Sequence, residues 1–438
     1  MENIMIRNLQ LTNYRCFESL QLNFNRQFTV LVGNNGSGKT SVMDALSLSL
    51  ASYFLGMEGY STGSITRNDV YSFTEPLGNR LDRVYRYPAK VRCRGRIFEE
   101  EINWERELIS SKGSTTYGGA KELKECVSEV YTRAKYGAPE IILPVLAYYG
   151  TGRLWAKKQE RKNTEKLNFD SRFLGYKNCL DPMSNDSQLK KWLKSMTYLE
   201  IQEQMMVSEL EAVKEALVKC FNTSGNQQLM GIAKECRYSV KSDEIEIIYE
   251  TCEGRKEICP FSNLSDGYRN MLGLVADIAY RMAVLNPQLF NEVLTETGGV
   301  ILIDEIDLHL HPAWQRTIVR SLKEIFPKVQ FIVSSHSPIV ISSVESEELI
   351  ILEQGSQVEN IVPTYGKESD DILQSIMNVP SRQDDVLSMI DNFYKTLEAG
   401  EYSEAEAELG NLKDVLGEDD PTTIKAETAL NLESMEIV

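Results

Sequence analysis

The sequence predicts an α/β protein with a mixed sheet and flanking helices, an inserted helical segment and a C-terminal helical tail. The first observation is a continuous apolar run at 28–32, typical of a buried strand, followed by helical spacing of apolar residues over 42–51. The second is the return of this pattern in the second half, where apolar runs at 300–303 and 331–333 flank a helical stretch. The third is the change beyond Gly366 to short, acidic, helix-forming segments.

The same periodicities organise the rest of the chain. Alternating apolar and polar residues at 4–11 predict a half-buried strand, and apolar residues at helical spacing over 189–220 predict one helix. Three short helices are expected at 384–399, 401–416 and 420–435. The predicted organisation is a first lobe at 1–155 with a glycine-rich loop, a mainly helical insertion at 156–235, a second lobe at 236–366, and a helical region for partner docking at 367–438.

Composition limits the classes of function. The chain has 42% hydrophobic and 25% charged residues, which is ordinary for a globular protein. It has no apolar run of the roughly 18–20 residues that a membrane span needs, and its first residues lack the pattern of a signal peptide. Its eight cysteines include no Cys-x-x-Cys pair. We therefore expect reduced thiols in a cytoplasmic protein without membrane association.

The net charge of −17 argues against non-specific wrapping of DNA by the whole surface. A local exception is the run in which Lys90, Arg92, Arg94 and Arg96 alternate with other residues. In a strand, this spacing places four cations on one face. That face could contact DNA or another nucleic acid, contact a protein partner, or be an ordinary solvated strand face.

The glycine-rich loop after the first buried strand matches G-x-x-x-x-G-K-[ST] between Gly33 and Thr40. Its glycines let backbone N–H groups turn inward around a polyphosphate, and the dipole of the following helix adds to the attraction. Lys39 would reach the β- and γ-phosphate oxygens of ATP, and the Thr40 hydroxyl would bind Mg²⁺. The expected nucleotide-binding residues in this loop are Asn34, Asn35, Gly36, Ser37, Gly38, Lys39, Thr40 and Ser41.

A second strand ends in two carboxylates, Asp304 and Glu305, after the apolar run at 300–303. Beside a phosphate loop, the first carboxylate is expected to hold Mg²⁺, directly or through water, and the second to accept a proton from the attacking water. The sequence therefore predicts Asp304 as a metal ligand and Glu305 as the general base.

A second anion site is predicted where Ser265 and Gly267 open a helix, because a hydroxyl, a glycine and a helix N-terminus together attract phosphate. The alternative is a simple capped helix start. His336 follows another buried strand, where ligands gather in open α/β sheets, and we expect it to contact the γ-phosphate or the water. His309 and His311 are expected to shape a turn and a subunit interface.

The order of these motifs resembles the ABC-class ATPases of the SMC, RecF and overcoming-lysogenization-defect group. The segment Asn13-Tyr-Arg15-Cys-Phe is similar to the N-terminal signature of that group, which implies that Arg15 approaches the nucleotide. The resemblance implies a head-to-tail dimer that encloses two ATP molecules, with Ser265 and Gly267 as the signature loop. The expected Q-loop falls at 148–153, but this segment contains no Gln.

Flanking segments are similar to the PtuA-like ATPases of Septu anti-phage systems, including retron-associated ones. They are 172–182 with Trp192, Tyr365-Gly-Lys, and Val379-Pro-Ser-Arg with the tail to Pro421. This resemblance implies a separate HNH nuclease, PtuB, that docks on the helices after about Pro380. The alternatives are a DNA-repair ATPase resembling RecF and an ATP-dependent scaffold with slow turnover. No histidine remains outside the ATPase motifs for a nuclease within this chain.

Overall fold

The computed structural model describes residues 4–77, 80–154, 171–182, 187–223, 231–359 and 362–435. The chain forms two compact units, Met1–Ile372 and Leu373–Val438. Of the insertion predicted at 156–235, residues 156–170, 183–186 and 224–230 lie outside the described part. No helix in that described part is long and apolar enough to cross a lipid bilayer.

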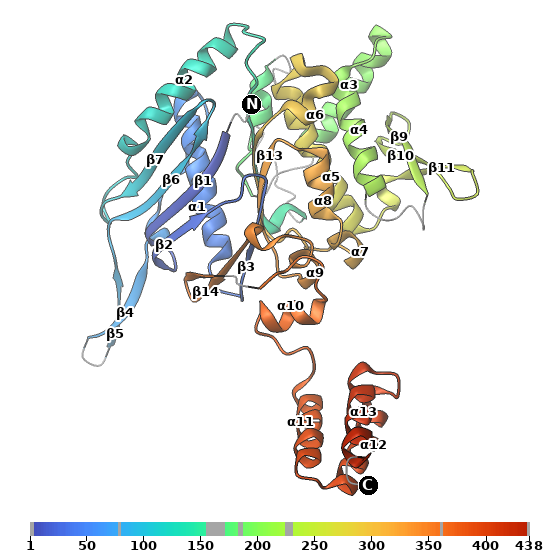
Figure 1. Ribbon diagram of the computed structural model, residues 1–438. Helices are drawn as coiled ribbons and strands as arrows, with labels where there is room; N and C mark the ends of the chain where they lie inside the picture. The colour runs from blue at the N-terminus through green and yellow to red at the C-terminus, as the bar shows by residue number, and fades with distance from the viewer. Residues whose placement is uncertain are drawn as a thin grey trace. The chain divides into compact units, whose positions relative to one another are not determined.

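A six-stranded sheet forms the centre of the first unit (Figure 1). Five of its strands are parallel, and the short edge strand β15 pairs antiparallel with β14, so the sheet is mixed, as predicted. Every residue of the strands β3, β8, β12 and β13 is buried, because helices and a second sheet cover both faces. In spatial order the strands are β15 (Ser356–Val358), β14 (Leu349–Glu353), β3 (Phe28–Val32), β13 (Val329–Ser334), β12 (Gly299–Ile303) and β8 (Val145–Tyr149).

Antiparallel strands make up the smaller sheets of this unit. The strand predicted at 4–11 is confirmed within β1, which pairs with both β2 and β6. One sheet has the order β2 (Phe17–Asn23), β1 (Ile4–Tyr14), β6 (Ala89–Ile97) and β7 (Glu100–Leu108). The others are β11 (Lys256–Pro260), β10 (Glu244–Glu250) and β9 (Ile232–Ser239), and the pair β4 (Ser72–Leu77) and β5 (Arg80–Tyr85).

The four cations of β6 share one face of the strand, as their spacing predicts. Glutamates of β7 lie beside them across the antiparallel pair. Lys90 Nζ is 2.9 Å from Glu107 Oε1, and Arg92 Nε is 2.8 Å from Glu105 Oε2. Lys90 and Arg92 are thus paired with opposite charges across the two strands.

The main helices of the first unit are α1 (Lys39–Ala51), α2 (Lys121–Lys135), α3 (Ser187–Glu203), α4 (Ser208–Thr223), α5 (Asp266–Leu285) and α8 (Ile318–Ile325). α1 contacts strands of both the six-stranded sheet and the β2-β1-β6-β7 sheet. The prediction of one helix over 189–220 is wrong, because Gln204 adopts a left-handed backbone with φ 51° and ends α3 before α4 begins. The shorter helices of this unit are α6 (Val293–Glu296), α7 (Pro312–Gln315) and α9 (Pro338–Ile341), and α10 (Ser369–Ser375) spans the boundary between the two units.

The second unit is a small helical domain. Its helices are α11 (Asp384–Glu398), α12 (Tyr402–Leu416) and α13 (Pro421–Met435), which confirms the three helices predicted there. Residues 373–438 contain four basic and fifteen acidic residues, so this stretch carries −11 of the total net charge of −17. Its core consists of Phe393, Leu397, Ala405, Leu409, Leu412 and Ala426.

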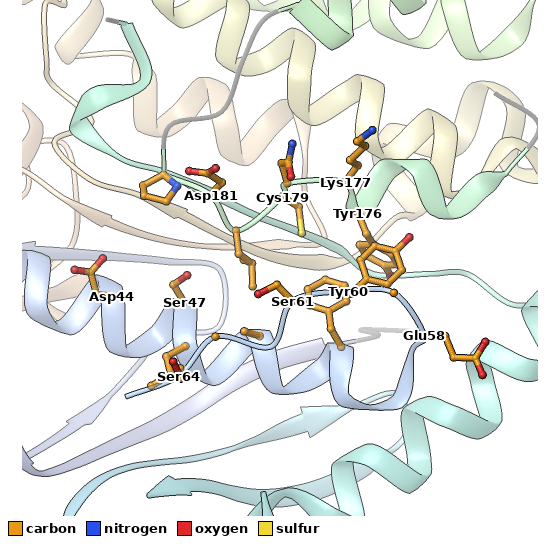
Figure 2. Close-up of a pocket in the computed structure, with 18 of the residues that line it drawn as sticks. Asp44, Ser47, Glu58, Tyr60, Ser61, Ser64, Tyr176, Lys177, Cys179 and Asp181 are labelled. Atoms are coloured by element: carbon orange, nitrogen blue, oxygen red, sulfur yellow. The ribbon is translucent and has the colours of Figure 1, made fainter. Parts of the chain in front are cut away.

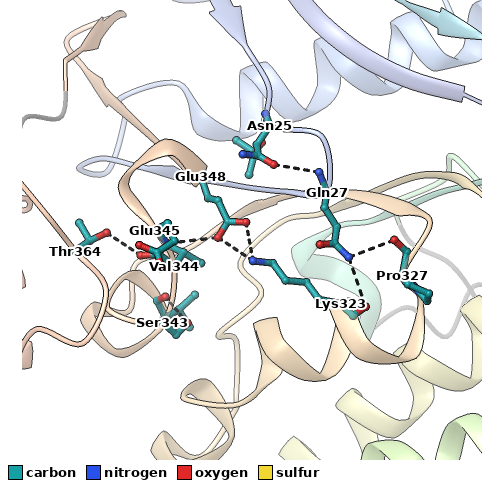
Figure 3. A network of polar contacts seen from close by, with 11 residues as sticks. Asn25, Gln27, Lys323, Pro327, Ser343, Val344, Glu345, Glu348 and Thr364 are labelled. Carbon is teal, nitrogen blue, oxygen red and sulfur yellow. Dashed lines mark hydrogen bonds and ion pairs between the residues drawn. The ribbon is translucent and has the colours of Figure 1, made fainter. Parts of the chain in front are cut away.

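A polar network closes the N-terminal edge of the six-stranded sheet (Figure 3). Lys323 Nζ, near the end of α8, donates to both carboxylate oxygens of Glu348 at 2.6 and 2.8 Å. Gln27 Nε2 donates to the carbonyls of Lys323 and Pro327. The buried Gln330 side chain accepts from the N–H of Ile6 and donates to its carbonyl. These bonds hold the segments before β3, β13 and β14 together.

Candidate active site

Three loops meet at the opposite, C-terminal edge of the sheet, because the carboxyl ends of parallel strands lie on the same side. The phosphate loop follows β3, the two carboxylates follow β12, and the histidine segment follows β13. Together they surround a cavity of about 270 Å³. Its lining is Cys16, Asn35, Gly36, Gly38, Lys39, Thr40, Ser41, Asp304, Glu305 and His336.

The phosphate loop has the backbone of an anion cradle. Gly36 and Gly38 adopt left-handed conformations, with φ of 83° and 103°. A Cβ at Gly38 would also lie 2.3 Å from the ring of Phe17, so this position excludes a side chain. The buried Ser37 Oγ has no hydrogen-bond partner among the described residues. A buried hydroxyl without a partner is costly, and a phosphate oxygen would supply one.

Lys39 lies inside the cradle and is buried. Its Nζ donates to the carbonyls of Gly33 at 2.7 Å and Asn34 at 3.1 Å, which belong to the loop itself. Burial lowers the pKa of Lys39, although Asp304 and Glu305 act in the opposite direction. Its ammonium is therefore poorly compensated, and an anionic ligand in the cradle would supply the missing charge.

Asp304 is buried and held on two sides. Its Oδ2 accepts from Thr40 Oγ1 at 3.1 Å, so the two predicted metal ligands lie side by side. Its Oδ1 accepts from Ser334 Oγ at 2.5 Å, and that hydroxyl accepts in turn from the N–H of Glu305 at 2.8 Å. Ser334 was not predicted as a site residue. Its only signal in the sequence is its place at the end of a buried strand.

Glu305 and His336 line the same cavity and are half-buried. Glu305 has a left-handed backbone with φ 50°, which turns the chain sharply after the strand. Burial lowers the pKa of His336, and the charge of Lys39 lowers it further, so its imidazole is neutral at pH 7. The N–H of His336 donates to Asp307 Oδ1 at 3.3 Å, which holds the backbone in place.

The helix of the predicted second anion site begins outside this cavity. Ser265 is exposed and is the N-cap of α5, and its hydroxyl makes no capping hydrogen bond. Gly267 packs on the turn after β12, because a Cβ there would lie 2.4 Å from the His309 carbonyl. His311 serves that turn as the N-cap of α7, accepting from the N–H of Ala313 at Nδ1. Among the described residues that line the phosphate cavity, none belongs to α5.

Arg15 lies beside the phosphate loop but lines a different cavity, of about 880 Å³. Its guanidinium contacts Asp44 of α1 at 2.5 Å and Asp69 at 3.0 Å. Figure 2 shows this second cavity between α1 with the segment 58–64 on one side and the segment 171–182 on the other. Arg15 therefore lines a different cavity from the phosphate-loop residues with which the sequence groups it.

The family models that match this chain agree with a nucleotide-binding site. The family model described as AAA domain matches residues 8–223, and that described as AAA ATPase domain matches residues 152–341. The chain is similar to the retron Vc95 probable ATPase of Vibrio cholerae serotype O1 biovar El Tor, with 28% identity over 91% of this chain and 84% of the relative. It is 26% identical to the Septu protein PtuA of Bacillus thuringiensis over 90% of each chain. A solved SMC head bound to the C-winged helix domain of ScpA matches 82% of this chain and 98% of its own, with 17% identity and a TM-score of 0.47.

Proposed function

We propose that two copies of this ATP-hydrolysing enzyme, as an ATPase of the ABC/SMC/OLD type, enclose two ATP molecules and control a partner HNH nuclease in anti-phage defence. The proposal of defence rests on the relatives, which are named as a retron ATPase and a Septu PtuA protein. The proposal of the dimer rests on the position of Ser265, which lies outside the cavity formed by its own chain.

The phosphate loop binds the triphosphate through its backbone N–H groups, its Ser37 hydroxyl and Lys39. The ammonium of Lys39 exchanges its two loop carbonyls for phosphate oxygens, which removes the penalty of its burial. Mg²⁺ would be held by Thr40 and Asp304, whose oxygens are already 3.1 Å apart. The metal supplies neutralisation of the phosphate charge.

Glu305 is the general base for the attacking water. It directly follows Asp304, faces the same cavity and has its backbone N–H fixed by Ser334. A carboxylate in this place can take the proton of a water aimed at the γ-phosphate. His336 remains neutral at pH 7 and can hydrogen bond to that water or to the phosphate.

Ser265 completes the site of the partner copy. Helix α5 has 20 residues, and its first N–H groups receive no capping bond from the Ser265 side chain. An uncapped and exposed helix N-terminus is a favourable place for an anion. In a head-to-tail dimer, the γ-phosphate bound to one copy meets Ser265 and Gly267 of the other.

A trapped dimer tests this proposal. We expect Glu305→Gln to retain ATP and to elute as a dimer in size-exclusion chromatography only when ATP and Mg²⁺ are present. Adding Ser265→Arg should abolish the ATP-dependent dimer, because the bulky arginine side chain blocks the phosphate site. The matched control is Ser110→Arg, at another exposed serine, which should leave the dimer intact. ATP-dependent dimers that persist with Ser265→Arg would contradict the composite site.

The acidic C-terminal unit is the proposed docking platform for the nuclease. Its net charge of −11 suits a partner with a basic surface, as a DNA-cleaving enzyme has. Arg382, before α11, is bonded to Asp420, before α13, since its Nη2 donates to both carboxylate oxygens at 2.9 and 3.0 Å. The unit also has its own core, so the head is not expected to need it for folding.

Truncation after Pro380 tests the docking role. The shortened chain should hydrolyse ATP at the normal rate but should no longer capture a co-expressed HNH nuclease in an affinity pull-down. The full-length Ser110→Arg variant serves as the positive control for capture. Capture by the truncated chain would show that the nuclease docks elsewhere.

A further inference from the structure

Two adjacent tyrosines end β8, at the place where the resemblance predicts a Q-loop without supplying a Gln. Successive side chains of a strand point to opposite faces, so Tyr148 and Tyr149 diverge. Both are buried. Tyr148 Oη donates to Asp44 Oδ1 at 3.0 Å, and Tyr149 Oη donates to Asp277 Oδ2 at 2.7 Å. One dipeptide therefore contacts α1, which begins at the phosphate loop, and α5, whose N-cap is Ser265.

Tyr149 makes a second hydrogen bond at the C-terminal edge of the six-stranded sheet, where the candidate active site lies. Its backbone carbonyl accepts from the N–H of Asp304 at 2.8 Å, within the pairing of β8 with β12. Its phenol and its carbonyl thus reach two different parts of the site. The carbonyl holds the backbone of Asp304, the residue proposed to bind the metal, and the phenol holds the middle of α5.

The contact on α5 is an anchored one. Asp277 also accepts from Arg281 Nε at 2.8 Å, and Arg281 is buried, with Nη1 donating to the carbonyls of Gly175 at 2.9 Å and Lys177 at 3.2 Å. Burial and Asp277 raise the pKa of Tyr149 well above 10, so the phenol remains a donor at physiological pH. Asp277 lies about 18 Å along the helix axis from Ser265, at the rise of an α-helix, so a small tilt at Asp277 displaces the N-terminus.

Tyr148 contacts a different set of partners. Asp44, which accepts its hydroxyl, also pairs with Arg15, and it lies one helical turn after Lys39 and Thr40 on α1. This network stays within the half of the site that its own chain supplies. Tyr148 is therefore connected to the binding of ATP by the same copy, and has no contact of this kind with α5 among the described hydrogen bonds.

We infer that Tyr149 is a positioning residue. It links the ends of β8 and β12, beside Asp304, to α5, so that one copy presents Ser265 correctly to the ATP bound by its partner. Tyr148 is its counterpart on the other face, and it positions α1 for ATP bound to the same copy. The inference rests on the composite site proposed above. It predicts that substitution of one tyrosine changes kcat and that substitution of its neighbour changes KM for ATP.

Single variants give the first readout. Tyr149→Phe removes one hydroxyl, keeps the ring and leaves the Asp277–Arg281 pair in place, so the fold should persist in thermal unfolding. We expect kcat to fall about tenfold with KM for ATP unchanged, since each copy binds ATP normally but serves its partner poorly. Tyr148→Phe should instead raise KM severalfold. A second variant, Asp277→Glu, moves the acceptor and keeps its charge, and should behave as Tyr149→Phe does.

Mixed dimers give the decisive readout. Lys39→Ala cannot use its own phosphate loop but still presents a normal Ser265. Mixed with Tyr149→Phe, it should restore turnover well above the sum of the two separate rates, because one site of each mixed dimer is then intact. Mixed with Tyr148→Phe, it should give no such rise, because that defect lies in the only working loop.

The reference mixture is Lys39→Ala with Ser265→Arg, which must show restoration if sites are shared between copies. If the reference rises and the Tyr149→Phe mixture does not, the positioning role of Tyr149 is wrong. That role is equally wrong if Tyr148→Phe is restored as fully as Tyr149→Phe. If the reference itself fails to rise, the composite site is wrong, and the inference falls with it.

Discussion

The two edges of the six-stranded sheet carry similar kinds of side chain with different consequences. At the N-terminal edge, Lys323 is paired with Glu348, and the amide of Gln330 is bonded to backbone groups on both its oxygen and its nitrogen. At the C-terminal edge, the hydrogen bonds of Lys39 go to carbonyls of its own loop, and Ser37 Oγ is buried without a partner in the described structure. At the N-terminal edge, these polar groups have their partners. At the C-terminal edge, Lys39 has no carboxylate and Ser37 has no partner in hydrogen-bond contact among the described residues.

A large number of charged side chains therefore does not indicate a ligand-binding site. The cations of β6 make the same point, because glutamates of β7 lie beside them. A buried ammonium without a carboxylate in hydrogen-bond contact and a hydroxyl without an acceptor are better indicators, since each gains when a ligand arrives. Substitutions at the two edges should therefore affect different measurements.

The largest effect is expected at the C-terminal edge. Glu305→Gln keeps the shape of the side chain but removes the proposed base, so kcat for ATP should fall by about 10²- to 10⁴-fold while ATP still binds. Steady-state phosphate release and equilibrium binding of a fluorescent ATP analogue measure the two quantities. Glu347→Gln, at an exposed carboxylate near the other edge, is the control and should leave both unchanged. Normal turnover in Glu305→Gln would remove Glu305 from the mechanism.

A smaller effect, on stability alone, is expected at the N-terminal edge. Lys323→Met leaves Glu348 nearly buried without its cation, which should lower the free energy of unfolding by about 1–3 kcal/mol. Urea unfolding followed by circular dichroism measures this loss. The kcat and KM for ATP should be unchanged, because the network of Lys323 lies at the edge away from the phosphate loop. A loss of turnover larger than the loss of folded protein would contradict the division between the edges.

The smallest effect concerns pH. The pKa of His336 is lowered by burial, so the unfolded chain takes up a proton near pH 6.5 before the folded chain does. The neutral imidazole therefore contributes its full stability above pH 6.5, and this contribution is lost as the pH falls. In ATP-free protein, the decrease in unfolding free energy between pH 7.5 and 5.5 should be smaller in His336→Gln than in the parent. Equal decreases would mean that His336 has the same pKa in both states.

The parts of the site that depend on short segments could be predicted from the sequence. A buried apolar run followed by Gly33–Thr40 predicts a strand, a cradle and a helix from local periodicity and glycine alone. Asp304 and Glu305 were predictable for the same reason, since they directly follow a buried run. The three helices of the C-terminal unit also follow from local spacing, and the structure contains them.

Which of these groups form hydrogen bonds with one another depends on the tertiary structure, because the partners lie far apart in the chain. Ser334 orients Asp304 across 30 residues, and the hydroxyl of Tyr148 reaches Asp44 across 104. The turn of Gln204 that divides α3 from α4 depends on a backbone conformation that apolar spacing does not report. Local pattern identified the phosphate loop, and only the pairing of distant strands showed which residues surround the cavity and that Ser265 does not line it.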